Sequence, residues 1–269
     1  PSSDPHISEY LPERYKCIAW VSGFTGSAGT LAITQDFAGL WTDSRYFVQA
    51  NEQLAGTGFE LVKLKLQGSA EYADWMAEKL PAGATVAFDG NLASLQVAQA
   101  VQQTLEPLGI RVNGQADLLS PLWTDRPSLP LAPAYLLEEE ITGQSTASKL
   151  EAVRKALQKN RAEYHLVSSL DDLAWLFNVR GQDVPCNPVV LGFALISGSK
   201  ATLFIEPSKL NEAAVSSLAQ SGVEVRRYED LFSAIDSLTD TTILIDPKRT
   251  CFAVYDRIPD TVKIIEKLN

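Results

Sequence analysis

The chain has 269 residues, 45% of them apolar and 21% charged, which is the composition of an ordinary globular protein with one large or two ordinary domains. The net charge of −10 comes without any basic cluster beyond pairs such as Arg226-Arg227, which argues against nucleic acid as a partner. No window of about eighteen apolar residues and no basic-then-apolar leader occur, so we expect a cytoplasmic protein that does not enter a membrane. The three cysteines, Cys17, Cys186 and Cys251, lie too far apart for a zinc knuckle and favour no disulfide framework.

The first half of the chain is predicted to be α/β, beginning with a compact block at Cys17–Ala50. Short apolar or β-branched runs predict three strands in this block, at Cys17–Ser22, Thr30–Thr34 and Gly39–Thr42. Period-2 and period-3.6 patterns predict further elements downstream: strands at Phe59–Lys65, Thr85–Asp89 and Gly109–Val112, and helices at Glu71–Leu80 and Ser94–Leu105.

A glycine-rich string, GFTGSAG, separates the first two predicted strands. Its glycines, Gly23, Gly26 and Gly29, follow the spacing G-x-x-G-x-x-G, and the next residues, TLAIT, are typical of a strand. A phosphate loop requires Gly-Lys-Ser/Thr opening a helix, and a dinucleotide fingerprint requires G-x-G-x-x-G leading into one. The pattern therefore favours a structural turn over a phosphate site.

Polar residues follow the third predicted strand, in Trp41-Thr42-Asp43-Ser44-Arg45, just before a segment of helical composition. Asp43 or Ser44 is predicted to cap that helix, because the free N–H groups of a helix start need acceptors. Arg45 is placed differently, since a cation in the first turn opposes the helix dipole. We therefore expect Arg45 to serve an anionic partner, either a carboxylate of the protein or one on a ligand.

The three prolines in Trp123–Pro133 predict a linker, and the sequence beyond it repeats the first half. After an amphipathic helix at Ser148–Asn160, Ala174-Trp175 corresponds to Ala19-Trp20, VEVRRY to FELVKL, EDLFSAIDSL to EYADWMAEKL, and TTILIDP to ATVAFDG. The predicted organisation is a first domain at 1–125, a Pro-rich linker at 126–141 and a second domain at 142–269. Because the second copy opens with a helix and a strand that the first copy lacks, we expect the first domain to be missing both and the chain to be a fragment.

Residues suited to catalysis are few. His6 lies in a polar segment, and His165, inside the apolar run YHLV, is better interpreted as a buried histidine satisfied by the backbone than as a metal ligand. Asp171-Asp172 most simply caps the helix that carries Trp175, and the run Glu138–Glu140 is typical of a solvated face. No G-x-S-x-G string occurs, and no cysteine has a recognisable histidine partner.

Two weaker alternatives stay open at this point. Asp43 and Asp89, at two predicted strand ends, could form a carboxylate pair for acid/base chemistry. The loop Asn178–Pro188 is stiffened by prolines and either borders a binding site or is a plain turn, in which Arg180 and Asp183 could pair. From the residues alone, the chain is a two-domain α/β protein without a visible catalytic apparatus.

The strings GFTGSAGT, WTDSRYFVQA and SSLDDLAWLFNVRGQDVPCNPV, together with the junction WTDRP, strongly resemble the two N-terminal, non-catalytic domains of three-domain Xaa-Pro aminopeptidases (aminopeptidase P, in the creatinase/prolidase superfamily). The resemblance covers essentially the whole chain. It implies two similar mixed-sheet domains of the creatinase N-terminal, ribonuclease H-like type, flanked by helices.

In that family, a C-terminal pita-bread domain carries two Asp, one His and two Glu around a dinuclear metal centre, commonly manganese or zinc. Nothing in this chain resembles that domain, so the resemblance implies no catalytic residue, no metal ligand and no cofactor bound by this chain. The residue that does carry over is Arg45, because the arginine of the family's W-T-D-x-R string contacts bound peptide. Ser44 stands where glycine is frequent, a small departure that leaves Arg45 in place.

The implied parent is a metallo-aminopeptidase, a hydrolase that removes the N-terminal residue preceding a proline from a peptide with proline in second position. These domains would gate and shape its active site and be inactive alone, and family members often form homodimers, largely through the catalytic part. Two alternatives remain. One is a protein-binding module on the same scaffold without peptidase activity, and the other is an amidinohydrolase relative, which usually has a single N-terminal domain.

Overall fold

The computed structural model describes residues 1–268, which form two compact units that are not two simple halves of the chain. The first unit consists of Pro1–Asp4 and Glu9–Ser128, and the second of Pro5–Ser8 and Leu129–Asn269. The chain therefore passes from one unit to the other three times. Within residues 1–268, no helix has the length and apolar character needed to cross a membrane.

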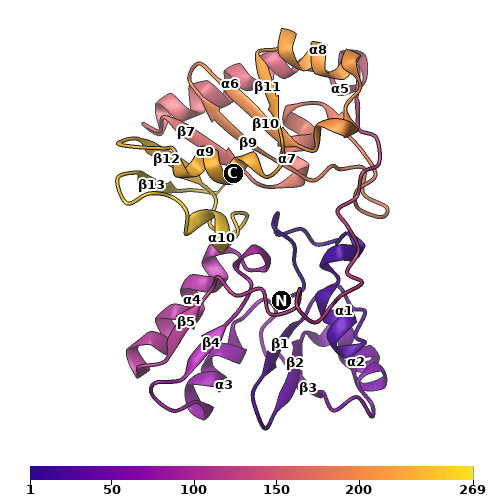
Figure 1. Ribbon diagram of the computed structural model, residues 1–269, viewed down its shortest axis with the longest axis vertical. Coiled ribbons are helices and arrows are strands. Elements are labelled where there is room, and N and C mark those ends of the chain that lie inside the picture. The colour runs from indigo at the N-terminus through magenta and orange to yellow at the C-terminus, as the bar shows by residue number, and fades with distance from the viewer. Residues whose placement is uncertain (269) are drawn as a thin grey trace. The chain divides into compact units, whose positions relative to one another are not determined.

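The first unit alternates strands with helices (Figure 1). Its strands are β1 (Thr30–Ile33), β2 (Ala38–Thr42), β3 (Glu60–Lys63), β4 (Thr85–Ala87) and β5 (Arg111–Asn113). Its α-helices are α1 (Cys17–Ser22), α2 (Phe47–Gln53), α3 (Glu71–Lys79) and α4 (Leu95–Leu105). Short 3-10 helices complete it: η1 (Glu13–Tyr15), η2 (Ser44–Tyr46), η3 (Gly90–Leu92) and η4 (Glu106–Leu108).

The strands of the first unit form two separate sheets. In one sheet β2 is central, antiparallel to β1 and parallel to β3; in the other, β4 and β5 pair in parallel. Successive side chains of β2 point to opposite faces, so Leu40 packs with Ile18 and Phe24 on one side, while Trp41 packs with α3 on the other. Both faces of β2 are therefore buried.

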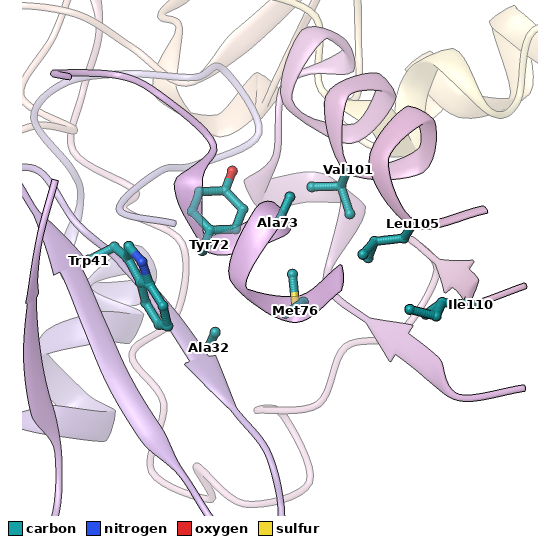
Figure 2. Packing of buried hydrophobic residues seen from close by; sticks show 8 residues of the cluster. All are labelled: Ala32, Trp41, Tyr72, Ala73, Met76, Val101, Leu105 and Ile110. Atoms are coloured by element: carbon teal, nitrogen blue, oxygen red, sulfur yellow. The ribbon is translucent and has the colours of Figure 1, made fainter. Parts of the chain in front are cut away.

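Apolar spacing explains why α3 and α4 pack where they do. Leu95, Ala98, Val101 and Leu105 recur along one face of α4 and are all buried, and Ser94 caps the helix by accepting a hydrogen bond from the Val97 N–H at 3.2 Å. In Figure 2, the buried side chains of α3 lie between Trp41 and Ala32 on one side and those of α4 and Ile110 on the other. This cluster forms one core of the unit.

The prediction of a strand at Cys17–Ser22 is wrong, because this segment is helix α1. The six residues bury Cys17 and Ile18 and leave Trp20 40% exposed, and the Gly23 N–H closes the helix by donating to the Ala19 carbonyl. Gly23 has φ of 79°, the left-handed conformation that ends helices and favours glycine. A six-residue apolar run is too short for its period to separate a helix from a strand.

The second unit repeats the alternation with more strands. Its strands are β6 (Tyr135–Leu136), β7 (Tyr164–Val167), β8 (Val179–Arg180), β9 (Gly192–Ser197), β10 (Ala201–Ile205), β11 (Val223–Arg226), β12 (Thr242–Ile245) and β13 (Lys263–Glu266). Its helices are α5 (Glu139–Thr142), α6 (Thr146–Lys159), α7 (Leu170–Leu176), η5 (Pro207–Lys209), α8 (Glu212–Gln220), α9 (Asp230–Asp236) and α10 (Phe252–Tyr255). The range 126–141, predicted as a linker, contains β6 and the start of α5.

Six strands of the second unit form one mixed sheet in the order β11-β10-β9-β7-β12-β13. Strand β9 is antiparallel to both of its neighbours, β10 and β7, whereas the remaining pairs are parallel. The predicted fold class, two similar mixed-sheet α/β domains flanked by helices, is confirmed. The helix that carries Trp175 is α7, but the residue at its N-cap is Ser169, so Asp171 and Asp172 lie in its first turn rather than before it.

Candidate functional site

Arg45 and Asp43 form a two-pronged ion pair at the end of β2. The Arg45 Nε donates to Asp43 Oδ1 at 2.9 Å, and Nη2 donates to Oδ2 at 2.8 Å. Asp43 also accepts from the Arg45 backbone N–H at 3.1 Å and so caps η2, the 3-10 turn that leads into α2. The predicted cap of α2 itself is not found, because its N-cap is Tyr46 and no side chain caps it. The carboxylate is 8% exposed, whereas the arginine side chain is 48% exposed.

One edge of the Arg45 guanidinium stays available. Among residues 1–268, no group accepts a hydrogen bond from its Nη1, although the charge also lies 5.2 Å from the centre of the Tyr46 ring. The sequence predicted an anionic partner for Arg45, either a carboxylate of the protein or one on a ligand. In the structure, the carboxylate of Asp43 is such a partner. Since the two hydrogen bonds to Asp43 use only Nε and Nη2, the guanidinium is held in place while Nη1 remains available as a donor to solvent.

The pair shifts the titration of both groups. The hydrogen bond from Arg45 is the main cause that lowers the pKa of Asp43, and the hydrogen bond to Asp43 is the main cause that raises the pKa of Arg45. Because the folded-state pKa of Asp43 lies below its unfolded value, the stabilisation from this pair is present above the unfolded pKa. It is lost as the pH falls through the lowered folded pKa.

The pKa of Asp43 is expected to rise in the Arg45→Ala variant, because the hydrogen bond that chiefly lowers it is removed. NMR titration of the side-chain carboxyl carbon measures this directly. Asp236 serves as the internal control, since Arg257 lowers its pKa in the second unit and should continue to do so. An Asp43 pKa that stays low in the variant would contradict the pairing described above.

The glycine-rich loop before β1 is held by side chains rather than arranged around an empty anion site. Thr25 accepts hydrogen bonds from Gln49 at 3.0 Å and Gln53 at 2.9 Å, both on α2. The Ser27 and Tyr46 hydroxyls lie 2.8 Å apart. A Cβ at Gly26 would lie 2.2 Å from the Phe24 ring, so the loop needs glycine there for close packing. These contacts support the interpretation as a structural turn.

The predicted pairing of Arg180 with Asp183 is wrong. Arg180 donates to the Ala174 and Val179 carbonyls, and its distance to the latter is 2.9 Å. Asp183 instead binds Lys209 at 2.5 Å and accepts from the Leu191 N–H at 2.7 Å. Their side chains are 0% and 2% exposed, so this is a buried ion pair that ties the loop to η5.

Sequence reasoning missed Lys209 and a second buried lysine, Lys149. Lys149 is 2% exposed and donates to the Trp175 carbonyl at 2.7 Å and to Asn178 Oδ1 at 2.5 Å, at the end of α7. Burial is the main cause that lowers the pKa of Lys149. No sequence signal marks either lysine, because their partners lie 26 to 29 residues away along the chain.

Both histidines are buried or partly buried in the second unit and bind the backbone. His6 is 1% exposed; its Nδ1 lies 2.9 Å from the Ser168 carbonyl, its Nε2 lies 2.9 Å from the Tyr228 hydroxyl, and its ring packs on Phe193. His165 Nδ1 lies 3.2 Å from the Leu244 carbonyl, and burial is the main cause that lowers its pKa. The interpretation of His165 as a histidine satisfied by the backbone agrees with this geometry.

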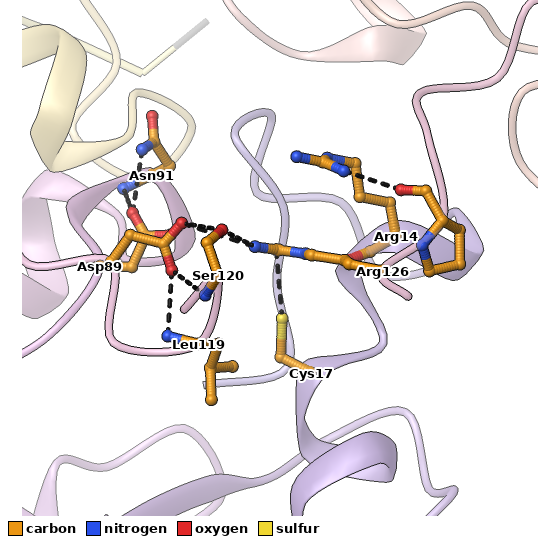
Figure 3. Close-up of polar contacts among 9 residues, drawn as sticks. Arg14, Cys17, Asp89, Asn91, Leu119, Ser120 and Arg126 are labelled. Carbon is orange, nitrogen blue, oxygen red and sulfur yellow. Dashed lines mark hydrogen bonds and ion pairs between the residues drawn. The ribbon is translucent and has the colours of Figure 1, made fainter. Parts of the chain in front are cut away.

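The WTDRP junction is fixed to the start of the first unit (Figure 3). Arg126 donates to the Arg14 carbonyl at 3.0 Å, to the Ser120 hydroxyl at 3.1 Å and towards the Cys17 sulfur at 3.6 Å. Trp123 stacks on Trp20 with the ring centres 5.0 Å apart. The junction residues therefore fasten the end of the first unit to η1 and α1, a role that the prolines alone did not indicate.

The carboxylates that the sequence suggested as an acid/base pair serve separate caps. Asp43 caps η2 as described, and Asp89 caps η3 by accepting from the Asn91 backbone and side chain, both at 2.9 Å. Within residues 1–268 there is no group of three or more His, Cys, Asp or Glu side chains placed to hold a metal ion. Arg45 stays the one residue for which the sequence predicted contact with a ligand.

Comparison with known proteins matches both parts of the chain to one family. Two family models, both described as the Creatinase/Prolidase N-terminal domain, match residues 7–112 and residues 125–269. The chain is 40% identical over 242 residues to the probable Xaa-Pro aminopeptidase P of Chaetomium globosum, covering 88% of this chain and 38% of that protein. It is 33% identical over 238 residues to Xaa-Pro aminopeptidase app-1 of Caenorhabditis elegans, covering 88% of this chain and 39% of that protein.

A solved structure agrees with these relatives. The crystal structure of X-prolyl aminopeptidase from Caenorhabditis elegans, described as a cytosolic enzyme with a di-nuclear active site, matches with a TM-score of 0.92 and 30% sequence identity. The match covers 100% of this chain and 45% of that one. The chain thus spans less than half the length of each of these three relatives.

Proposed function

Because the chain belongs to the creatinase/prolidase N-terminal domain family, we propose that it is the non-catalytic N-terminal part of an Xaa-Pro aminopeptidase. The parent protein would remove the first residue of a peptide whose second residue is proline. One observation carries this proposal: the whole chain superimposes on less than half of an X-prolyl aminopeptidase with a TM-score of 0.92. The reaction is therefore assigned to the part of the parent that this chain does not cover.

The chemistry of the reaction would be supplied by a divalent metal, manganese or zinc, in the catalytic part of the parent. The di-nuclear active site of the Caenorhabditis elegans enzyme supports this assignment. The residues described here do not fit such a centre, since no cluster of three potential ligands exists among residues 1–268. This chain would instead act by narrowing the entrance to the active site. A cytoplasmic location is proposed on the same relative, which is described as cytosolic.

Arg45 is the residue through which this chain would touch the peptide. Its position is fixed by the buried carboxylate of Asp43, and its side chain is 48% exposed with Nη1 unpaired among residues 1–268. A guanidinium fixed in this way loses little rotamer freedom when it binds a carbonyl or carboxylate of a ligand. The proposed role is therefore recognition of the peptide backbone rather than proton transfer, because arginine keeps its charge throughout the accessible pH range.

The purified chain is expected to release no amino acid from an Ala-Pro-Ala peptide, with or without added Mn²⁺ or Zn²⁺. Liquid chromatography of the peptide and free alanine measures this, with the parent protein as the control that should cleave. Cleavage by the purified chain would contradict the assignment of the reaction to the remainder of the parent. A parent that binds proteins but cleaves no such peptide would favour the binding-module alternative instead.

A further inference from the structure

A small cavity lies in the first unit, beside α1 and the glycine-rich loop. Its volume is about 240 Å³, and its lining includes Ile18 and Ala19 of α1, residues 24–27 of the loop and residues 9–11. Sites for whole small molecules usually have volumes of about 300–1,000 Å³. This cavity is therefore of the size that suits a single bulky side chain of a longer ligand.

The inner lining of the cavity is aromatic and aliphatic. Phe24 is 1% exposed, Ile18 6% and Tyr15 8%, so these three side chains form its floor. Tyr10 also lines the cavity and is 57% exposed, which places its ring at the mouth. Such a lining favours an apolar side chain, because a polar group that entered would lose its hydrogen bonds to water.

Two charged residues line the cavity, Glu9 and Lys16. Lys16 forms an ion pair with Glu13, whereas Glu9 is exposed. The charge of Glu9 also acts on Arg45, where it adds to the rise in the pKa of the guanidinium that the hydrogen bond to Asp43 chiefly causes. Glu9 thus lies close enough to Arg45 for their charges to interact, and its carboxylate opposes an acidic side chain at the mouth.

Tyr46 links the cavity to Arg45. The Arg45 Cζ lies 5.2 Å from the centre of the Tyr46 ring, and that ring meets Phe24 of the lining edge-on, with the centres 5.8 Å apart. The Tyr46 hydroxyl lies 2.8 Å from the hydroxyl of Ser27, which also lines the cavity. An extended peptide advances about 3.3 Å per residue, so about three residues span the distance from Arg45 to the cavity.

We propose that this cavity is a subsite for one bulky apolar side chain, such as that of phenylalanine, of the peptide that Arg45 binds. The inference rests on the proposed function and adds to it the class of peptide. Only one residue precedes the proline of such a peptide, and the reaction is assigned to the remainder of the parent. The side chain that enters the cavity therefore belongs to a residue after the proline.

The parent protein and a set of five-residue peptides test the subsite. The reference peptide is Ala-Pro-Ala-Ala-Ala, and each of its last three residues is changed in turn to phenylalanine, lysine or aspartate. At one of these positions phenylalanine is expected to raise kcat/KM about tenfold, mainly through a lower KM, because burial of the ring favours binding. Lysine at that position should bring no gain, and aspartate should bring a loss.

Ala19→Phe fills the cavity and is expected to reduce the tenfold preference for the phenylalanine peptide to less than twofold. The matched control is Ala100→Phe, which lies on α4, is partly exposed and is outside the lining, so it should keep the preference. A preference that survives Ala19→Phe, a larger gain with lysine, or no preference in a parent that cleaves the reference peptide would overturn the subsite alone. A parent that cleaves none of the peptides would contradict the proposed function as well.

A second measurement uses the 269-residue chain itself and needs no variant. N-acetyl-phenylalaninamide should cause saturable NMR shifts of the backbone amides of Gly26 and Ser27, which belong to the lining, whereas N-acetyl-alaninamide should not. Equal shifts with both probes, or shifts that leave these two amides unchanged, would overturn the subsite whatever the parent cleaves.

Discussion

Replacing Asp183 with alanine is expected to destabilise the second unit by about 3–5 kcal/mol, because the variant leaves Lys209 as a buried charge without its partner. Both side chains are almost fully buried and lie 2.5 Å apart, and Asp183 also accepts the Leu191 N–H. The alanine therefore removes the hydrogen-bonded ion pair with Lys209 and the hydrogen bond from the Leu191 N–H together. Denaturant unfolding followed by circular dichroism measures the change in the free energy of unfolding.

The matched control for this prediction is Lys200→Ala. Lys200 pairs with Glu224 at 2.6 Å, but the two side chains are 61% and 47% exposed, so water screens the pair. Exposed pairs contribute about 0–1 kcal/mol, so this variant should unfold almost as the parent chain does. Similar losses in Asp183→Ala and Lys200→Ala would show that burial does not set the strength of the Asp183–Lys209 pair.

In the proposed parent aminopeptidase, Arg45→Ala is expected to lower kcat/KM for an Xaa-Pro peptide by about 10- to 100-fold. A hydrogen bond from a charged group contributes about 1.5–3 kcal/mol, and each 1.4 kcal/mol corresponds to a factor of ten. Steady-state kinetics with peptides of different length measures the loss, which should fall mainly on KM if Arg45 binds the peptide equally before and during the reaction. Arg45→Lys should recover part of the lost kcat/KM, since lysine keeps the positive charge but cannot form two parallel hydrogen bonds as a guanidinium does.

Arg257→Ala is the matched control for the Arg45 prediction. Arg257 pairs with Asp236 through Nε and Nη2, as Arg45 does with Asp43, and its side chain is 47% exposed. It lies in the second unit, and the proposed function gives it no contact with peptide. Unchanged kinetics in Arg45→Ala, or an equal loss in both variants, would remove Arg45 from the proposed peptide site.

The sequence predicted the elements whose period could be measured over several residues. The helices at α3 and α4 and the strands from β1 to β5 lie where apolar spacing placed them, within a few residues. The prediction of secondary structure failed at α1, because its six residues make less than two helical turns. The signal that would have identified the helix is Gly23, which ends it in the left-handed conformation. The repeat contained the missing information, because Ala174-Trp175 of the second copy lies within the helix α7.

Only those contacts of the candidate site that join residues close together in the sequence could be predicted. The cap at Asp43 and an anionic partner for Arg45 follow from the position of both residues at a helix start, and the two groups are only two residues apart. The partners of Asp183 and Lys149 were not predictable in this way. A buried ion pair depends on which loops the tertiary fold brings together, and neighbouring residues such as Arg180 offer a plausible but incorrect partner.

The burial of His6 has a consequence for how the chain folds during its synthesis. The ring is buried in the second unit against Phe193 and Tyr228, and the latter follows it by 222 residues. At translation rates of about 5–20 residues per second, these partners leave the ribosome some 10–45 seconds after the histidine does. His6 must therefore wait, unpacked, until the chain as far as Tyr228 has been made, and only then can the second unit close around it.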